Sequence, residues 1–133
     1  MDKKVLVLCT GNSCRSIIAE ALINRELNGI SAFSSGVKPS GKVNPNAKKV
    51  LEENDAWDDA YHSKVIEKVM DIEYDLVVTV CDNANGSCPV SPKKSEVIHV
   101  GFEDPDGQAY EAFEETFMLI KNTLLPIVKD KFS

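Results

Sequence analysis

The sequence lacks long apolar segments, a surplus of positive charge and any cluster of histidines. No stretch approaches the roughly 18 apolar residues of a membrane-spanning candidate, and the apolar run nearest the amino end spans only residues 5–8. We therefore expect neither a signal peptide nor a membrane span, and no membrane partner. The net charge of -6 also argues against a nucleic-acid partner, because a nucleic-acid surface needs a basic stripe.

Structural zinc and a secreted disulfide framework are both poor explanations of the cysteines. The four cysteines lie at positions 9, 14, 81 and 88, with four residues between the first two and six between the last two. Structural zinc sites usually place about two to four residues between paired cysteines, and His62 and His99 supply no nearby complement. Without a targeting segment we expect a cytoplasmic protein, where cysteine pairs are usually catalytic, redox-active or metal-binding.

The pattern of the whole chain predicts one α/β domain over residues 1–133. A chain of this length buries roughly two-thirds of its unfolded surface, and no linker, repeat or low-complexity segment interrupts it. Continuous apolar runs alternate with helical spacing, which indicates a parallel sheet with helices on both faces. Strands are expected at residues 4–8, 30–34, 75–80 and 97–100, and helices at residues 16–28, 44–54, 63–70 and 109–129.

Three local features refine these elements. The first helix, over residues 16–28, has the spacing of an amphipathic helix packed on the sheet. Asn44 followed by Pro45 is a helix-start signal, and Pro126 is expected to kink or shorten the last helix. The acidic segment 55–62, which carries a tryptophan and a tyrosine, is either a surface turn with two core anchors or the rim of a cleft.

The segment from Cys9 to Ser16 has the composition of a reactive site. It follows an apolar run and opens a helix, and five residues separate the thiol of Cys9 from the guanidinium of Arg15. With Gly11 allowing a tight turn, the backbone N–H groups can converge on an oxyanion, and the helix start and Arg15 add positive potential. That potential favours a thiolate, so Cys9 is expected to be a nucleophile. The expected oxyanion-binding residues are Thr10, Gly11, Asn12, Ser13, Cys14 and Arg15.

Topology is expected to bring other reactive side chains to the same place. In a parallel sheet the strand-to-helix loops lie at the carboxyl edge, and Cys9, Cys81 and Asp104 each follow a predicted strand. Cys81 and Cys88 flank a small polar loop that could rearrange to close a disulfide, although free cysteines are also common core residues. Asp104, which precedes a proline, is either a catalytic acid or a turn residue.

The segment Cys9-x5-Arg15-Ser16 resembles the active-site loop of the low-molecular-weight protein tyrosine phosphatases and their arsenate-reductase relatives. The residues of this segment, Cys-Thr-Gly-Asn-Ser-Cys-Arg-Ser, are similar to the corresponding residues of the thioredoxin-coupled arsenate reductases. The resemblance implies a three-layer α/β/α fold with a four-stranded parallel sheet of order 2-1-3-4. It covers essentially the whole chain and is strongest at residues 9–16 and 101–105.

The resemblance implies an enzyme that reduces arsenate, for which phosphate or sulfate can act as a mimic. Cys9 is the nucleophile of that chemistry, and Ser16 stabilises its thiolate. Arg15 holds the oxyanion, and Asp104 protonates a leaving oxygen.

The resemblance also implies a relay of thiols. Cys81 attacks the adduct between Cys9 and arsenic, which releases arsenite and leaves a disulfide between Cys9 and Cys81. Cys88 then moves the disulfide to Cys81 and Cys88, where thioredoxin reduces it; glutaredoxin or another thiol could serve the same disulfide. No tightly bound cofactor is implied, and we expect a monomer.

Two other functions stay open from the sequence. A phosphomonoesterase acting on phosphotyrosine or a small phosphate ester needs only Cys9, Arg15 and Asp104, and would leave Cys81 and Cys88 unexplained. A non-catalytic oxyanion or metal sensor would not need a complete reactive loop.

A potassium ion is a further expectation from the resemblance, because some relatives bind one beside the loop. Matching oxygens could come from Asn12, Glu20, Ser35 and Ser63. The acidic ligand expected two residues after Ser63 is absent, because Val65 occupies that position.

Overall fold

The computed structural model describes residues 3–9, 15–36, 43–57, 74–80, 96–102 and 107–132. Their elements, in chain order, are β1 (Lys3–Cys9), α1 (Arg15–Glu26), β2 (Ile30–Gly36), α2 (Pro45–Glu53), β3 (Leu76–Thr79), β4 (Glu96–His99) and α3 (Tyr110–Lys131). The four strands form one parallel sheet in the order β2-β1-β3-β4. The predicted fold class and strand order are therefore confirmed, while the helix predicted at residues 63–70 lies outside the described residues.

Strand β1 is buried on both sides of the sheet. Val5 and Val7 belong to the main core, the buried side chains between the sheet and helices α1, α2 and α3. Leu6 and Leu8 face the other side and are also fully buried, in a second cluster with Tyr74, Val77 and the half-buried Phe33. Strand β1 is therefore covered on both faces, as the continuous apolar run predicts for a central parallel strand.

Helix α1 is buried on all sides over most of its length. Every residue from Arg15 to Ile23 is buried, because α1 packs against β1 and β2 and is also covered by α2 and α3. The prediction of an amphipathic helix over residues 16–28 was wrong in this respect, since α3 covers the side that a surface helix would turn to water. The helix ends at Glu26, and Gly29 adopts a φ of 81° in the following turn.

Helix α2 begins where the sequence predicts. The side chain of Asn44 accepts a hydrogen bond from the backbone N–H of Asn46 at 2.8 Å, and Pro45 is the first helical residue. After the helix, Ala56 is buried and Trp57 packs half-buried against the main core. In the described residues 55–57, the acidic segment is thus a turn with a core anchor.

Helix α3 covers the main core with a single apolar face. The inward residues that the spacing predicts are all buried, namely Phe113, Phe117, Ile120, Leu124 and Val128. The helix continues through Pro126 to Lys131, so the predicted shortening was wrong. Pro126 and Asn122, four residues earlier, are both exposed, so water can reach the carbonyl group that a proline leaves without a backbone N–H partner.

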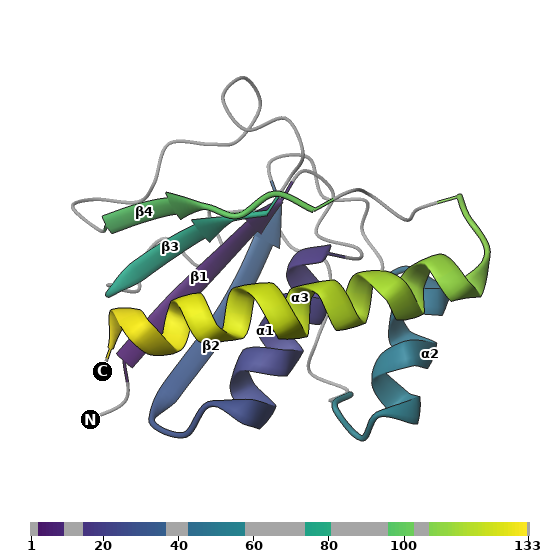
Figure 1. The fold of residues 1–133 in the computed structure, drawn as a ribbon, viewed down its shortest axis with the longest axis horizontal. Helices are drawn as coiled ribbons and strands as arrows, with labels where there is room; N and C mark the ends of the chain where they lie inside the picture. The colour runs from purple at the N-terminus through teal and green to yellow at the C-terminus, as the bar shows by residue number, and fades with distance from the viewer. Residues whose placement is uncertain are drawn as a thin grey trace.

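The arrangement of the elements defines two ends of the molecule. In Figure 1 the strand arrowheads all point toward one end, which we call the carboxyl edge, and both chain termini lie at the opposite end. Helix α3 runs across α1, and α2 lies beside the first turns of α3. Among the described residues, no helix is long and apolar enough to cross a membrane.

Candidate active site

The expected nucleophile lies at the carboxyl edge of the central strand. Cys9 is the last residue of β1, where its backbone pairs with Gly36 of β2, and α1 begins at Arg15. Residues 10–14, which are expected to bind the oxyanion, lie outside the described residues. The structure therefore describes the strand and the helix that delimit the predicted loop: the strand ends one residue later and the helix begins one residue earlier than predicted.

Successive hydrogen bonds extend the sheet beyond the strands at this edge. The N–H of Val80 donates to the carbonyl of Leu8 at 2.9 Å, and the N–H of Phe102 donates to the carbonyl of Val80 at 3.1 Å. These bonds place Val80 and Phe102 at the carboxyl edge. Val80 directly precedes Cys81, and Phe102 lies two residues before Asp104. Cys81, Cys88 and Asp104 themselves lie outside the described residues, so their roles stay predictions.

Arg15 is buried and oriented by the same extended segment. Its side chain is 5% exposed, and its Nη1 donates a hydrogen bond to the carbonyl of Phe102 at 3.0 Å. A buried guanidinium needs such a partner, because an unsatisfied buried charge is costly. The first turn of α1 contains no acidic residue, so the positive end of the helix is not offset there, and Ser16 is fully buried beside Arg15.

A second polar group lies between α1 and β2. Glu20 is 6% exposed, and the hydroxyl of Ser34 donates to its Oε1 at 2.6 Å. Burial raises the pKa of the Tyr74 phenol, and the negative charge of Glu20 raises that pKa further. The sequence analysis named Ser35 as a potassium ligand, which stays a prediction, and did not name Ser34, which the structure shows bonded to Glu20.

Two of the four residues expected to hold potassium, Glu20 and Ser35, are among the described residues. Ser35 is fully buried, and its Oγ has no hydrogen-bond partner among the described residues. Ser35 directly follows Ser34, whose hydroxyl bonds to the buried carboxylate of Glu20, and hydroxyl and carboxylate oxygens are ligands that suit a hard cation. Asn12 and Ser63 lie outside the described residues. Within the described part of the chain, no group of three or more His, Cys, Asp or Glu could hold a metal ion.

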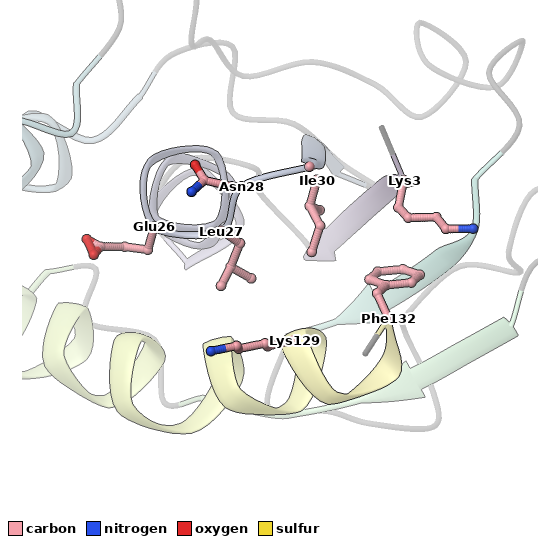
Figure 2. A pocket seen from close by; sticks show the side chains of 8 residues that line it. Lys3, Glu26, Leu27, Asn28, Ile30, Lys129 and Phe132 are labelled. Atoms are coloured by element: carbon pink, nitrogen blue, oxygen red, sulfur yellow. The ribbon is translucent and has the colours of Figure 1, made fainter. Parts of the chain in front are cut away.

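A pocket of about 410 Å³ lies at the other end of the sheet and is not part of this site. Figure 2 shows Leu27, Ile30 and Phe132 around its interior, while the ammonium groups of Lys3 and Lys129 point to opposite sides. The two ammonium groups therefore do not converge on one anion. The remaining lining residues are Glu26, Asn28 and Gly29, and none of the eight was predicted to belong to the active site.

Comparisons with known proteins agree with this architecture. A profile of the family described as "Low molecular weight phosphotyrosine protein phosphatase" matches residues 4–130. Arsenate reductase 1 of Bacillus cereus (strain ATCC 10987 / NRS 248) is 41% identical over 113 residues, which cover 84% of this chain and 84% of that protein. The chain belongs to the low molecular weight phosphotyrosine protein phosphatase family.

Within that family, solved structures similar to this chain include arsenate reductases. The crystal structure of arsenate reductase from Archaeoglobus fulgidus DSM 4304 has a TM-score of 0.80 and 27% identity, covering 94% of this chain and 98% of that one. A structure described as an arsenate reductase in the phosphate binding state has a TM-score of 0.78 and 30% identity, covering 96% and 98%. The expected resemblance to arsenate reductases of the phosphatase fold is thus confirmed.

Proposed function

We propose that this protein is an arsenate reductase. The observation that carries the proposal is the meeting of three chain segments at the carboxyl edge: the end of β1, the residue before Cys81, and the segment 100–102 that leads to Asp104 and holds Arg15. The similarity to proteins named arsenate reductase supports the choice of substrate. The negative charge and tetrahedral shape of an arsenate ion are complementary to a loop whose backbone N–H groups converge at a helix N-terminus.

The first step is capture and attack. Arsenate binds to the backbone N–H groups of residues 10–14 and to the guanidinium of Arg15, which its bond to Phe102 holds in place. The hydroxyl of Ser16 stabilises the thiolate of Cys9, and this thiolate attacks arsenic to form a sulfur–arsenic bond. Asp104 protonates the leaving oxygen, which departs as water.

The second step is the reduction. The Cys81 thiolate attacks the sulfur of Cys9, the sulfur–arsenic bond breaks, and its electron pair stays on arsenic, which leaves as arsenite. Arsenic gains two electrons, and the thiols of Cys9 and Cys81 lose two in forming a disulfide. Cys88 then attacks Cys81, which frees Cys9 and moves the disulfide to Cys81 and Cys88.

The cycle closes when an external dithiol reduces the final disulfide. Thioredoxin is the proposed reductant, because a dithiol partner completes the exchange without another cofactor. The relay needs three reduced thiols at the start of each cycle, so we place the protein in the cytoplasm, which keeps thiols reduced. The segment between Cys81 and Cys88 has to rearrange, since Cys81 reacts first with Cys9 and then with Cys88.

A potassium ion is proposed as an accessory group. Glu20 and Ser35 are the described residues that would hold it, and when bound it would supply positive charge beside the oxyanion loop. The buried hydroxyl of Ser35, which lacks a hydrogen-bond partner among the described residues, supports this assignment. The test is the unfolding temperature with added KCl or choline chloride: wild type should gain stability only with potassium, and Glu20→Gln should lose that difference.

Phosphatase activity is the second candidate function. The family profile that matches residues 4–130 is that of phosphotyrosine phosphatases, and ester cleavage needs only Cys9, Arg15 and Asp104. Phosphate and arsenate are alike in charge and shape, so we expect weak hydrolysis of p-nitrophenyl phosphate alongside arsenate reduction.

The deciding experiment couples arsenate to NADPH oxidation through thioredoxin and its reductase. Wild type should oxidise NADPH in an arsenate-dependent manner, whereas Cys9→Ser, Cys81→Ser and Cys88→Ser should not. Normal turnover by either Cys81→Ser or Cys88→Ser would exclude the relay. A parallel assay with glutathione and glutaredoxin tests the identity of the reductant.

Hydrolysis of p-nitrophenyl phosphate provides the internal control. Cys81→Ser and Cys88→Ser should keep the phosphatase rate of wild type, because neither thiol takes part in ester cleavage. Cys9→Ser should lose both activities. If wild type hydrolyses the ester but never consumes NADPH with either reductant, the protein is a phosphatase and not a reductase.

A further inference from the structure

The last paired residues of β3 and β4 are joined by their side chains as well as by the sheet. Thr79 and His99 are register partners, and Thr79 Oγ1 and His99 Nδ1 are hydrogen-bonded at 2.7 Å. The carbonyl oxygen of Ile98 lies 3.5 Å from the same hydroxyl and is a much weaker partner. Thr79 is 4% exposed, whereas His99 is exposed. His99 of the edge strand β4 is therefore the hydrogen-bond partner of a buried hydroxyl on β3.

This pair lies at one edge of the described sheet. Strand β4 has four residues and pairs only with β3, because it is the outermost strand of the described sheet. Immediately beyond the pair, the N–H of Val100 donates to the carbonyl of Thr79 at 2.9 Å, and the N–H of Phe102 donates to the carbonyl of Val80 at 3.1 Å. Segment 100–102 therefore continues the pairing of β4 with β3 directly beyond the side-chain pair.

Segment 100–102 in turn orients Arg15. Phe102 presents its carbonyl to Nη1 of Arg15 at 3.0 Å, and its own side chain is 7% exposed in the main core. We propose that His99 is a positioning residue for oxyanion binding: through its bond to Thr79 it fixes segment 100–102, and through the Phe102 carbonyl it fixes Arg15. The inference rests on the proposed role of Arg15 in holding the oxyanion.

The test is a double-mutant cycle read out by phosphate binding. His99→Leu and Thr79→Val each remove one side of the bond, and each should weaken phosphate binding by roughly twofold to tenfold, the effect of one hydrogen bond. The double variant should bind no more weakly than the weaker single variant, because both changes remove the same interaction. His99→Asn, whose amide can still bond to Thr79, should recover most of the affinity. Wild-type affinity in both single variants, or fully additive losses in the double variant, would overturn the proposal.

Val97 supplies the matched control. It lies on β4 two residues before His99 and is 46% exposed, and it makes no side-chain hydrogen bond. Val97→Ala should leave phosphate affinity unchanged. A loss of affinity equal to that of His99→Leu would mean that any substitution on β4 weakens phosphate binding, and would refute a specific role for His99.

A second readout separates this inference from the proposed function. Hydrogen exchange of the Phe102 amide reports its bond to Val80 without any ligand, and the NMR signal of the Arg15 side chain reports its bond to Phe102. Both should change in His99→Leu and remain as in wild type in Val97→Ala. If wild type binds no phosphate, the proposed function fails, while these two signals still confirm or refute the coupling from His99 to Arg15.

Discussion

Arg15 donates a hydrogen bond from Nη1 to the carbonyl oxygen of Phe102, 87 positions away along the chain, at 3.0 Å. The bond joins the first residue of α1 to the segment that leads to Asp104. A carbonyl partner orients a guanidinium without cancelling its charge, so this contact does not neutralise Arg15. The start of α1 is thereby joined to the segment that follows β4.

Arg15→Lys should weaken phosphate binding about 10- to 100-fold. One ammonium group cannot reproduce the fork that bonds both to Phe102 and to two oxygens of an anion, and charged hydrogen bonds contribute about 1.5–3 kcal/mol each. Isothermal titration with phosphate measures the loss. Arg25→Lys is the matched control, because Arg25 also donates to a backbone carbonyl, that of Asp55 at 2.8 Å, but is exposed at the other end of α1. Equal affinities for wild type and Arg15→Lys would contradict the prediction.

Two leucines of α3 should respond very differently to truncation. Leu124 is fully buried in the main core, whereas Leu119 is 49% exposed. Leu124→Ala should lower the free energy of unfolding by about 2–5 kcal/mol, because it removes buried methyl groups and leaves a cavity. Leu119→Ala should change it by less than about 0.5 kcal/mol. Urea unfolding followed by circular dichroism gives both values, and similar losses would mean that the burial of α3 is assigned to the wrong face.

Asn44→Ala should destabilise the protein by about 1 kcal/mol. The substitution removes the side-chain acceptor for the N–H of Asn46 and leaves that group at the start of α2 unsatisfied. Asn44→Asp keeps an acceptor oxygen and should restore wild-type stability in the same urea experiment. Equal destabilisation by both substitutions would argue that Asn44 acts through another contact.

Tyr74 should make the protein less stable at high pH. Burial, with a contribution from the charge of Glu20, holds the pKa of this phenol above its usual value. Above a pH of about 10 the unfolded chain therefore releases a proton that the folded protein keeps, so stability falls as the pH rises. In Tyr74→Phe the fall between pH 9 and 11 should be shallower, by at most about 1.4 kcal/mol per pH unit. Unfolding curves at each pH measure the slopes, and identical slopes would contradict the assignment.

Local signals in the sequence were sufficient where one segment determines its own structure. The apolar run ending at Cys9, the Asn44 and Pro45 pair and the apolar face of α3 each predict an element that the structure confirms. The strand order followed from the family resemblance, which the relatives and the sheet both confirm.

The features that the sequence did not predict depend on contacts between distant segments. The surroundings of α1 depend on α3, which begins at Tyr110, so the spacing within residues 16–28 cannot show that α1 is covered on all sides. Ser34, which the sequence did not single out, reaches Glu20 because its side chain faces α1, and a shift of one residue in register would turn it to the other face of the sheet. Phe102 contributes a backbone carbonyl to Arg15, and a backbone acceptor has no signature in the sequence.

The positions of the two chain ends make the protein a candidate for circular permutation. Lys3 and Phe132 line the same pocket at the end opposite the carboxyl edge, so a short linker could join them without crossing the sheet. New ends could be opened at the exposed turn of Asn54 and Asp55. Such a chain would keep the β1-to-α1 loop and segment 100–102 intact, while the order in which the strands are synthesised would change.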